Sequence, residues 1–500
     1  MATGALAAKE PEVLDCDYLV VGAGATGMSF VDTLLTESKD TTVVLVDKLA
    51  SPGGHWHHAY PFVKLHQPAG LYGVASEPMG LVVGAREPLD TADLQSKDGL
   101  LSYYAKVLEK FVSSGRVRFF GNATYDETNG TLTSDERTYT VRCVKTVRTL
   151  SNVAVPSTTP PKFSVASGVN FKPVNDLMDA PADGSYVVLG AGKTGVDALL
   201  HLLSRGVQLE KISWVVPRDA WYWLRDRMFV GGNALKMYST LMKVLVKSPS
   251  LAEAYLELER LGFMGRLDSD IMPTVMKDAT ITSDELILLR TVKNVVRLGR
   301  VSAIESAAIN LASGELPLAS DVWVVDCTAS AVGQQAAETV WGGNAISIPT
   351  LGPPGFCFSA ALVAFIETKF ADDAVKNSLL PKEVIPTTFD PSALVHQLYA
   401  SMKVMNDLMA KCKPAMNFLM NCRLGPNAPC HVHWTKLLWY MLGPGQMMLN
   451  MPRLQKKIER GGFKDVPAKV KNAPGSKKKP ANQEVHAVPP THTTGDASRA

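Results

Sequence analysis

The chain has 500 residues, 46% of them hydrophobic, which is enough to bury a large core in about two to four structural units. Its net charge is +3, but residues 452–500 carry 11 Lys and Arg against 4 Asp and Glu, so the rest is mildly acidic and nucleic acid is not an expected partner. Seven scattered cysteines without a CxxC pair favour a reducing, cytoplasmic compartment. No secretory signal is found, which argues against secretion. No apolar run of about 18 residues is found, which argues against a spanning helix.

The first predicted element is a strand over residues 16–21, which runs into the sequence Gly-Ala-Gly-Ala-Thr-Gly at residues 22–27. An apolar helix over residues 26–36 follows. In such a unit the first glycine permits a tight turn, the second lets the backbone approach a pyrophosphate, and the third lets the helix pack against the strand. The free N–H groups and positive dipole end of the helix attract the phosphates. The pattern predicts a dinucleotide-binding turn.

A second strand is predicted over residues 41–46 and ends at Asp47, 20 residues after Gly27. A dinucleotide-binding fold places an acidic residue at this point to accept a hydrogen bond from a ribose hydroxyl. We therefore interpret Asp47 as a ligand of an adenosine ribose, with a solvated loop aspartate as the alternative. Lys48 follows directly.

The chain between this strand and the second unit alternates loops with regular elements. Residues 67–94 are rich in Gly and Pro and predict a loop over an active face. A helix is predicted over residues 99–113, and strands over 117–120 and 138–144. The Pro-, Ser- and Thr-rich segment 153–173 is typical of a linker into a second unit.

The second unit repeats the first pattern. A strand over residues 186–189 leads into Gly-Ala-Gly-Lys-Thr-Gly at residues 190–195, and a helix over 195–204 and a strand over 212–216 follow. Lys193 lies inside this turn and adds a cation that could lie beside a pyrophosphate. Two such turns imply two dinucleotides, and two dinucleotides imply electrons passed between them.

Arg218 follows the strand over residues 212–216, where folds that prefer NAD carry an acid. A guanidinium at this position suits a 2′-phosphate, so NADPH is predicted over NADH. Arg225 and Arg227 are alternatives for the same role. The aromatic residues 221–223 are interpreted as packing, with a lid over the substrate or nicotinamide as the alternative.

The rest of the chain is predicted to return to the first unit and then to become helical. Residues 321–327 form an apolar run with an acidic start, which is typical of a central parallel strand. The other predicted elements are a mainly helical region over 219–290, strands within 292–309, a strand over 346–350, a helix over 359–368, helices over 380–462, and a disordered tail.

The order of these motifs resembles the two-dinucleotide flavoproteins: a GxGxxG turn, an acidic strand end, Gly-Gly-His-Trp at residues 53–56, a second GxGxxG turn, and an apolar strand that ends in a turn at Thr328. Over residues 16–368 the chain is most similar to the class B flavin monooxygenases, which include N- and S-oxidising and Baeyer–Villiger enzymes. The resemblance implies an α/β fold, with an FAD-binding Rossmann-like domain, an inserted NAD(P)-binding Rossmann-like domain and a helical C-terminal region. FAD and NADPH are the implied cofactors.

The resemblance also implies roles for individual residues. The backbone at Gly54 would lie close to the flavin, with Trp56 beside it. Baeyer–Villiger-like members carry an aspartate five residues after the proline of a Tyr-Pro pair, and His66 stands there after Pro61. An imidazole at this point titrates near neutrality and could tune the flavin, with Gln67 sharing the task; a packed structural histidine is the alternative.

Two further features bear on the flavin. The turn at Thr328 would pass near FAD, and the helix that contains Ser359 would point its N-terminus at the flavin ring, where its dipole would stabilise a reduced, anionic flavin. The family fingerprint FxGxxxHxxx is not found before the second glycine-rich turn, where residues 153–161 read Val-Ala-Val-Pro-Ser-Thr-Thr-Pro-Pro. Oxygenation and plain dehydrogenation both stay open.

The expected catalytic residues are His66 and Gln67. The expected FAD-binding residues are Gly22, Gly24, Ala25, Thr26, Gly27, Asp47, Lys48, Gly54, His55, Trp56, Thr328 and Ser359. The expected NADPH-binding residues are Gly190, Gly192, Lys193, Thr194, Gly195 and Arg218. No metal site is predicted, because the spacing of His55, His57 and His58 suits no common one.

The predicted domains are residues 14–175 and 301–380 for FAD, 176–300 for NAD(P)H with a helical insertion, 381–462 for a helical C-terminal region, and 463–500 for a disordered tail. The C-terminal region, with His431, His433 and the apolar residues 437–451, is interpreted as a flap over the substrate pocket. Peripheral membrane contact is the less favoured alternative.

Residues and resemblance together predict an NADPH-dependent FAD monooxygenase that oxidises a small organic molecule, secondary metabolites included, with dioxygen and through a flavin hydroperoxide. The first alternative is an FAD-dependent NAD(P)H dehydrogenase or reductase without oxygenation. The second is a non-catalytic dinucleotide-binding protein.

Overall fold

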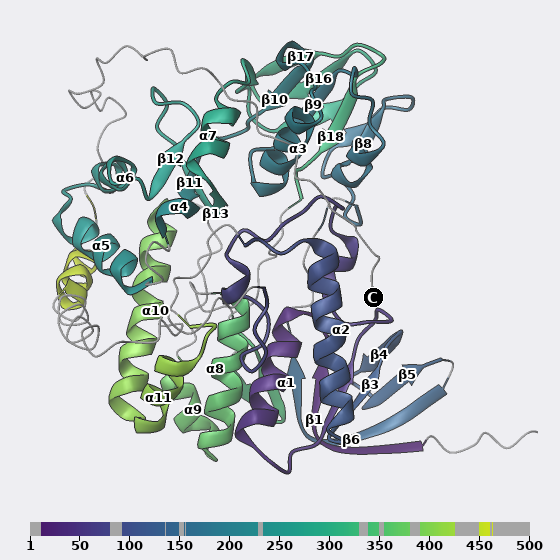
Figure 1. Cartoon of the computed structure of the whole chain (residues 1–500), viewed down its shortest axis with the longest axis vertical. Coiled ribbons are helices and arrows are strands. Elements are labelled where there is room, and N and C mark those ends of the chain that lie inside the picture. The colour runs from purple at the N-terminus through teal and green to yellow at the C-terminus, as the bar shows by residue number, and fades with distance from the viewer. Residues whose placement is uncertain are drawn as a thin grey trace, which may run out of the picture. The chain divides into compact units, whose positions relative to one another are not determined.

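The computed structural model describes residues 12–80, 93–135, 137–149, 155, 157–228, 234–329, 339–349, 355–380, 391–425, 450–460 and 463 (Figure 1). All of them belong to one compact unit, residues 1–465. The predicted disordered tail, apart from Phe463, and the histidines at 431 and 433 lie outside the described residues.

The first sheet holds the first glycine-rich turn. Its strands run in the order β19-β20-β6-β1-β2-β3, with a hairpin of β4 and β5 attached to β6. The strands are β1 (Glu12–Val21), β2 (Val43–Val46), β3 (Val117–Phe120), β4 (Ala123–Asp126), β5 (Thr131–Ser134), β6 (Arg137–Arg148), β19 (Trp341–Gly342) and β20 (Ala345–Ser347). From β20 to β3 every pairing is parallel. The four residues of β2 are all buried, as expected for an apolar strand covered on both faces.

Two apolar helices pack together beside this sheet. α1 (Ala25–Glu37) buries residues 26–35 and α8 (Phe356–Lys369) buries residues 357–367, and the two lie side by side (Figure 1). A helix that is apolar all round must be enclosed by other elements. α2 (Lys97–Ser113) contacts β3 and begins at Ser96, whose side chain accepts from the Gly99 N–H.

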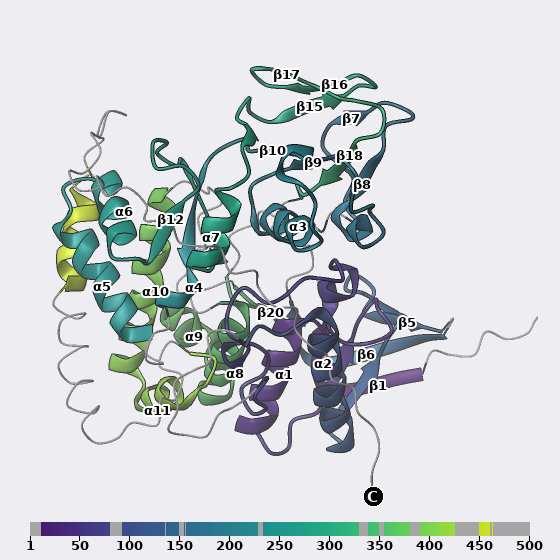
Figure 2. The same cartoon turned by 45° about the horizontal axis from the view of Figure 1, so that its top comes forward.

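The second sheet holds the second glycine-rich turn and is parallel throughout, in the order β14-β10-β9-β18-β8. Its strands are β8 (Phe171–Pro173), β9 (Tyr186–Leu189), β10 (Ile212–Val215), β14 (Asn294–Val296) and β18 (Trp323–Asp326). α3 (Lys193–Ser204) follows β9. A small sheet of β7 (Ser164–Val165), β15 (Val301–Ile304), β16 (Ala308–Leu311) and β17 (Gly314–Pro317) lies beside it (Figure 2).

The sheets divide the chain differently from the predicted domain boundaries. β18 was expected in the returning FAD domain, but it pairs with β9 in the second sheet. β7 and β8, placed by prediction before residue 176, pair with β15 and β18. The chain rejoins the first sheet with β19 and β20, and β20 lies beside β6. Parallel partners are set by contacts far apart in the sequence, which local patterns do not reveal.

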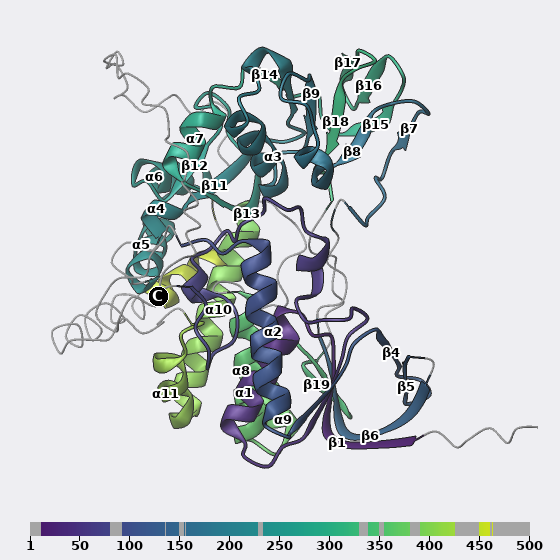
Figure 3. The same ribbon diagram turned by 45° about the vertical axis from the view of Figure 1, so that its right-hand side comes forward.

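The region 219–290 contains more helix than strand, as predicted, together with a three-stranded sheet that the sequence analysis did not predict. Its three-stranded sheet, β12-β11-β13, combines β11 (Ala220–Leu224), β12 (Met264–Arg266) and β13 (Val275–Ile281) (Figure 3). The helices are α4 (Arg225–Met228), α5 (Ala234–Lys247), α6 (Leu251–Arg260) and α7 (Ser283–Leu289). Every residue of β11 is buried, so the packing interpretation of its aromatic side chains is confirmed. Aromatic and β-branched runs favour strands, which accounts for the difference.

The described C-terminal region is helical, as predicted. It contains α9 (Asp373–Leu379), α10 (Pro391–Lys411) and α11 (Lys413–Asn421), and residues 450–459 form a further helix. Val395 and Leu398 of α10 and Leu454 pack into one apolar cluster with α5, α6 and β11. Among the described residues, no helix is long and apolar enough to cross a membrane.

Candidate functional site

The first glycine-rich turn has the geometry expected of a dinucleotide-binding turn. Gly22 has φ +105°, a conformation that favours glycine. A Cβ on Gly27 would overlap the carbonyl oxygen of Gly22, so α1 packs against the end of β1 as closely as a helix can. The second turn repeats this arrangement with Gly190 at φ +110° and Gly195 against the Gly190 carbonyl.

Both α1 and α3 begin with backbone N–H groups that can donate to a ligand. Within the described part of the chain, the N–H groups of Ala25 and Thr26 in α1, and those of Lys193 and Thr194 in α3, have no hydrogen-bond acceptor. A Cβ on Gly192 would meet no atom within 4 Å, so the space before α3 is open to a ligand. Free N–H groups at a helix N-terminus bind anions, and both turns therefore fit a pyrophosphate.

Asp47 lies at the end of β2 and is only 7% exposed, so the solvated-loop alternative is wrong. Its Oδ2 accepts from the Ala23 N–H at 2.6 Å and its Oδ1 accepts from the Leu49 N–H at 2.8 Å. The carboxylate thus braces the first turn. A ribose contact through its remaining lone pairs stays a prediction. Lys48 is exposed.

The loop after β2 folds onto the first turn. The Gly53 N–H donates to the Ala23 carbonyl at 2.9 Å, and a Cβ on Gly54 would lie 3.0 Å from the Cα of Gly24. Only glycine allows two backbones to approach so closely. Gly54 therefore lies directly against the first glycine-rich turn, and its predicted approach to the flavin stays a prediction.

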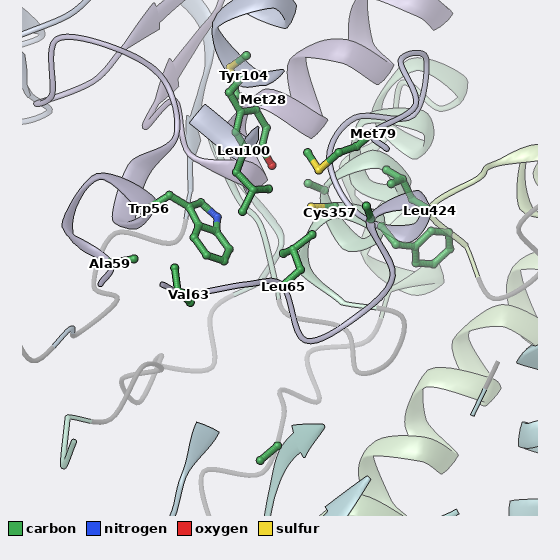
Figure 4. Close-up of a cluster of buried hydrophobic side chains, with 14 of the residues drawn as sticks. Met28, Trp56, Ala59, Val63, Leu65, Met79, Leu100, Tyr104, Cys357 and Leu424 are labelled. Carbon is green, nitrogen blue, oxygen red and sulfur yellow. The ribbon is translucent and has the colours of Figure 1, made fainter. Parts of the chain in front are cut away.

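Trp56 is 7% exposed and donates from Nε1 to the Tyr72 hydroxyl at 3.0 Å. Figure 4 shows its ring in a buried cluster with Leu65, Leu100 and Tyr104. His55 lies against the Trp56 ring at 4.9 Å between centroids, and burial lowers the pKa of His55 to about 4. Among the described residues, no three His, Cys, Asp or Glu side chains gather closely enough to hold a metal ion.

The loop that carries the two expected catalytic residues contacts α3. Tyr60 donates to Oδ2 of Asp197 at 2.6 Å, and Asp197 forms an ion pair with Lys193. The Phe62 and His201 rings stack at 4.0 Å with an interplanar angle of 8°. The Lys193 ammonium is therefore bound to Asp197, whereas the sequence prediction placed it beside the pyrophosphate.

His66 lies between the two nucleotide-binding units. Burial, and then the charges of Lys193 and Arg225, lower the pKa of His66 well below its usual range, so its imidazole is neutral at pH 7. The His66 carbonyl accepts from Arg225 at 3.0 Å. Gln67 donates from Nε2 to the Leu71 carbonyl at 3.0 Å, which commits its amide to the loop itself.

Two aromatic residues hold the second turn and were not singled out for this by the sequence. Trp214 donates from Nε1 to the Gly190 carbonyl at 2.9 Å, and Tyr222 donates to the Ala191 carbonyl at 3.0 Å. Both side chains are almost completely buried. A Trp in the strand after the turn, followed by an aromatic run, was the available signal.

A cationic cluster follows β10. Arg218 is exposed, and burial together with Arg218 and Arg300 lowers the pKa of Lys277. Arg225 does not belong to this cluster, because it is 3% exposed and donates to the His66 and Thr280 carbonyls. The suggestion that it reads a 2′-phosphate is wrong. The Arg227 side chain lies outside the described residues.

Thr328 is not where the resemblance placed it, while the predicted position of Ser359 near the flavin stays a prediction. Thr328 follows β18, and the neighbouring Cys327 carbonyl lies 2.9 Å from a Cβ built on Gly190, so this turn faces the second unit. Thr149 takes the corresponding place in the first unit and donates from Oγ1 to the Val21 carbonyl at 2.7 Å. Ser359 is fully buried, and its hydroxyl donates to the Gly355 carbonyl within its own helix.

No established protein-family profile matches the chain. Among solved structures, it is similar to the polycyclic ketone monooxygenase of Thermothelomyces thermophila (13% identity, 84% of this chain and 87% of that one, TM-score 0.48). It is also similar to a mutant flavin monooxygenase of Stenotrophomonas maltophilia (15% identity, 72% and 99%, TM-score 0.43) and to a cyclohexanone monooxygenase of Rhodococcus sp. Phi1 bound to NADP⁺ (14% identity, 74% and 85%, TM-score 0.42). These likenesses are distant.

Closer relatives are found by sequence. Uncharacterised proteins of Mycobacterium tuberculosis and Mycobacterium bovis are each 36% identical over 379 residues, which cover 74% of this chain and 70% of the relative. The chain, with its two glycine-rich turns on two separate sheets, belongs to the same protein family as these mycobacterial proteins.

Proposed function

We propose that the chain is an FAD-dependent oxidoreductase that takes its reducing equivalents from NADPH, and that it acts as a monooxygenase on a small organic molecule. One observation carries this proposal. Two strand–turn–helix units, each with open N–H groups at a helix N-terminus, are joined by the loop of residues 60–67, which contacts both. Two dinucleotides bound at these turns would face a common region.

The first unit would hold FAD. The N–H groups at the start of α1 would bind its pyrophosphate, Gly54 would leave room for it, and Trp56 would line the flavin ring. The chemistry that FAD would bring when bound is hydride acceptance from NADPH and reaction with dioxygen. The protein supplies binding, orientation and exclusion of water.

The second unit would hold NADPH. The start of α3 would bind the pyrophosphate, and the Arg218 and Lys277 side chains would bind the 2′-phosphate at the end of β10. Burial, and then the positive charges of Arg218 and Arg300, lower the pKa of Lys277, and these like charges repel each other. A bound phosphate would relieve this repulsion.

Two features of the loop and its surroundings support oxygenation over plain reduction. The neutral His66 ring can accept or donate a hydrogen bond at the reacting centre without adding a positive charge. The apolar cluster of Trp56, Leu65 and Cys357 excludes water from that side (Figure 4). With the cofactor bound, a dry site would suppress the side reaction that releases hydrogen peroxide without oxidising a substrate.

The test begins with the purified full chain, its visible spectrum and its extracted cofactor. Anaerobic mixing with NADPH or NADH measures reduction, and aerobic mixing measures oxygen uptake against hydrogen peroxide release. A marked delay between uptake and release supports the monooxygenase. Immediate, stoichiometric peroxide release supports a reductase without oxygenation. A chain that stays colourless after addition of FAD refutes the proposal.

A further inference from the structure

A polar bridge ties α3 to the loop of residues 60–67. Oδ2 of Asp197 accepts from the Tyr60 hydroxyl at 2.6 Å, and both carboxylate oxygens contact the Lys193 ammonium. The Lys193 and Asp197 side chains are 14% and 12% exposed. An ion pair so well shielded from solvent is stronger than a surface pair.

The bridge begins inside the second glycine-rich turn. Lys193 is the first residue of α3, and Asp197 lies one helical turn further along the same helix. The ammonium is therefore drawn along the helix, away from the open N–H groups at its start. Neighbouring contacts hold the same loop in place, because the Phe62 ring stacks on His201.

We propose that Asp197 and Tyr60 are positioning residues that set the affinity of the second turn for a dinucleotide in opposite directions. Asp197 restrains Lys193 while the turn is empty, and Tyr60 stabilises Asp197 once Lys193 has turned to the pyrophosphate. This inference rests on the proposed function, because it requires a nicotinamide dinucleotide at the second turn.

The charges explain why Asp197 and Tyr60 affect the dinucleotide affinity in opposite directions. A pyrophosphate carries two negative charges and competes with Asp197 for the Lys193 ammonium. When the ammonium leaves, the shielded carboxylate keeps one strong donor, the Tyr60 hydroxyl, which burial and the Asp197 charge hold in its protonated form by raising its pKa. The Tyr60–Asp197 bond then anchors the loop to α3 more firmly in the bound state than in the free one.

The experiment is a double-mutant cycle on the FAD-loaded full chain, with NADP⁺ titrated and the flavin absorbance change recorded. Asp197→Asn removes the competing anion, so the Kd for NADP⁺ is expected to fall about 3- to 10-fold and to depend more steeply on salt. Tyr60→Phe leaves Asp197 dependent on Lys193, so the Kd is expected to rise about 3- to 10-fold. In the Asp197→Asn background, Tyr60→Phe is expected to change the Kd less than about 2-fold.

A matched control is available on α10, where Lys403 and Asp407 form an exposed pair with the same spacing at 2.6 Å. Asp407→Asn is expected to leave the Kd for NADP⁺ unchanged. If Asp197→Asn does not fold by circular dichroism, Lys193→Met serves instead, and Tyr60→Phe should again lose its effect in that background.

The inference is overturned if both single variants shift the Kd in the same direction or not at all, or if Tyr60→Phe keeps its full effect in the Asp197→Asn background. A wild-type chain that binds FAD but no NADP⁺ would overturn the proposed function, and this inference with it. The two failures are therefore distinguishable.

Discussion

The Ala23 backbone N–H donates to Oδ2 of Asp47 at 2.6 Å, so the end of β2 holds the middle of the first glycine-rich turn. Asp47→Asn replaces one carboxylate oxygen with an NH₂ group, which then faces a backbone N–H. We expect the variant to lose about 1–3 kcal/mol of unfolding free energy and to bind FAD more weakly, because a buried donor loses its acceptor. Urea denaturation with and without FAD measures both effects.

The matched control for this variant is Asp126→Asn. Oδ1 of Asp126 also accepts from two backbone N–H groups, those of Thr128 and Asn129, but on an exposed turn. Water can replace its contacts, so its denaturation midpoint should stay at the wild-type value. Equal losses in the two variants would contradict a special role for Asp47.

A carboxylate at the second glycine of either turn is expected to abolish binding of one dinucleotide only. Gly24 and Gly192 are the N-cap residues of α1 and α3, with negative φ, and a Cβ on Gly24 would meet its nearest atom at an ordinary 3.6 Å. Aspartate is a favourable N-cap, so both variants should fold. Its charge would occupy the pyrophosphate position and repel the ligand.

We therefore expect Gly24→Asp to be purified without flavin. Gly192→Asp should remain yellow but lose reduction by NADPH, with the apparent affinity falling more than about 100-fold. Visible spectra and anaerobic reduction measure the two outcomes, and each variant is the control for the other. Yellow, NADPH-reducible Gly24→Asp protein would refute the assignment of the first turn to FAD.

Local pattern was sufficient for the two strand–turn–helix units. The apolar strands, the glycine spacing and the apolar helices lie next to each other in the sequence, and the structure confirms their order and, within a few residues, their bounds. Local pattern did not predict which strands pair with each other in the sheets. Thr149 and Thr328 each follow a strand, and only the pairing of β6 with β1 and of β18 with β9 decides which one faces which turn.

The sequence predicted the glycine-rich turns, whose geometry is local to the backbone. It did not predict contacts between side chains that are far apart in the sequence. Arg225 looked available for a phosphate because the sequence did not show that it is buried against the His66 carbonyl. Trp214 and Tyr222 support the second turn through contacts 24 and 31 residues apart. Such contacts depend on the tertiary structure, which the local spacing of residues does not reveal.

Arg218→Ala is expected to discriminate between the two nicotinamide cofactors. Loss of one charge-assisted contact of about 1.5–3 kcal/mol with the 2′-phosphate should raise the KM for NADPH roughly 10- to 100-fold. The KM for NADH should change less than about 2-fold, because NADH has no such phosphate. Lys277→Ala should act in the same direction.

Steady-state reduction of an artificial electron acceptor with each cofactor measures this. Arg260→Ala is the control, since Arg260 is an exposed arginine that pairs with Glu257 on α6. Equal effects of Arg218→Ala on NADPH and NADH would show that another residue reads the phosphate.

His55 predicts a loss of stability in mild acid. Its pKa of about 4 in the folded chain lies below the value near 6.5 expected when unfolded, so the unfolded state takes up the proton first. The stability that depends on a neutral His55 is fully present above about pH 6.5. It falls by up to roughly 1.4 kcal/mol per pH unit as the pH drops towards 4. His66, whose pKa is also lowered, adds to the slope.

His55→Gln removes one of the two histidines, His55 and His66, that take up a proton when the chain unfolds in mild acid. Unfolding free energies between pH 4 and 7 should therefore show a shallower slope in this variant than in the wild type. His396→Gln, at an exposed position on α10, should keep the wild-type slope. A wild-type stability that is flat over this range would contradict burial of a neutral His55.

Glu367 on α8 is the centre of a buried polar network that ties together five elements of the first unit. Its carboxylate accepts from the Lys376 ammonium of α9 at 2.6 Å and from Trp341 Nε1 of β19 at 2.8 Å. The Tyr18 hydroxyl of β1 donates to it at 2.9 Å, and Lys145 of β6 lies 3.2 Å away. The Glu367 and Lys376 side chains are 4% and 2% exposed.

Among the described residues, Glu367→Gln leaves the buried Lys376 ammonium with the partly exposed Asp373 as its counter-charge. Uncompensated burial of a charge typically costs about 3–5 kcal/mol, so a marked fall in Tm is expected, with NADPH affinity unchanged in the protein that remains folded. Adding Lys376→Met to Glu367→Gln removes the stranded charge and should recover much of the loss, because an apolar side chain of similar length suits a buried site. If the double variant is less stable than Glu367→Gln alone, the stranded charge is not the cause of the loss.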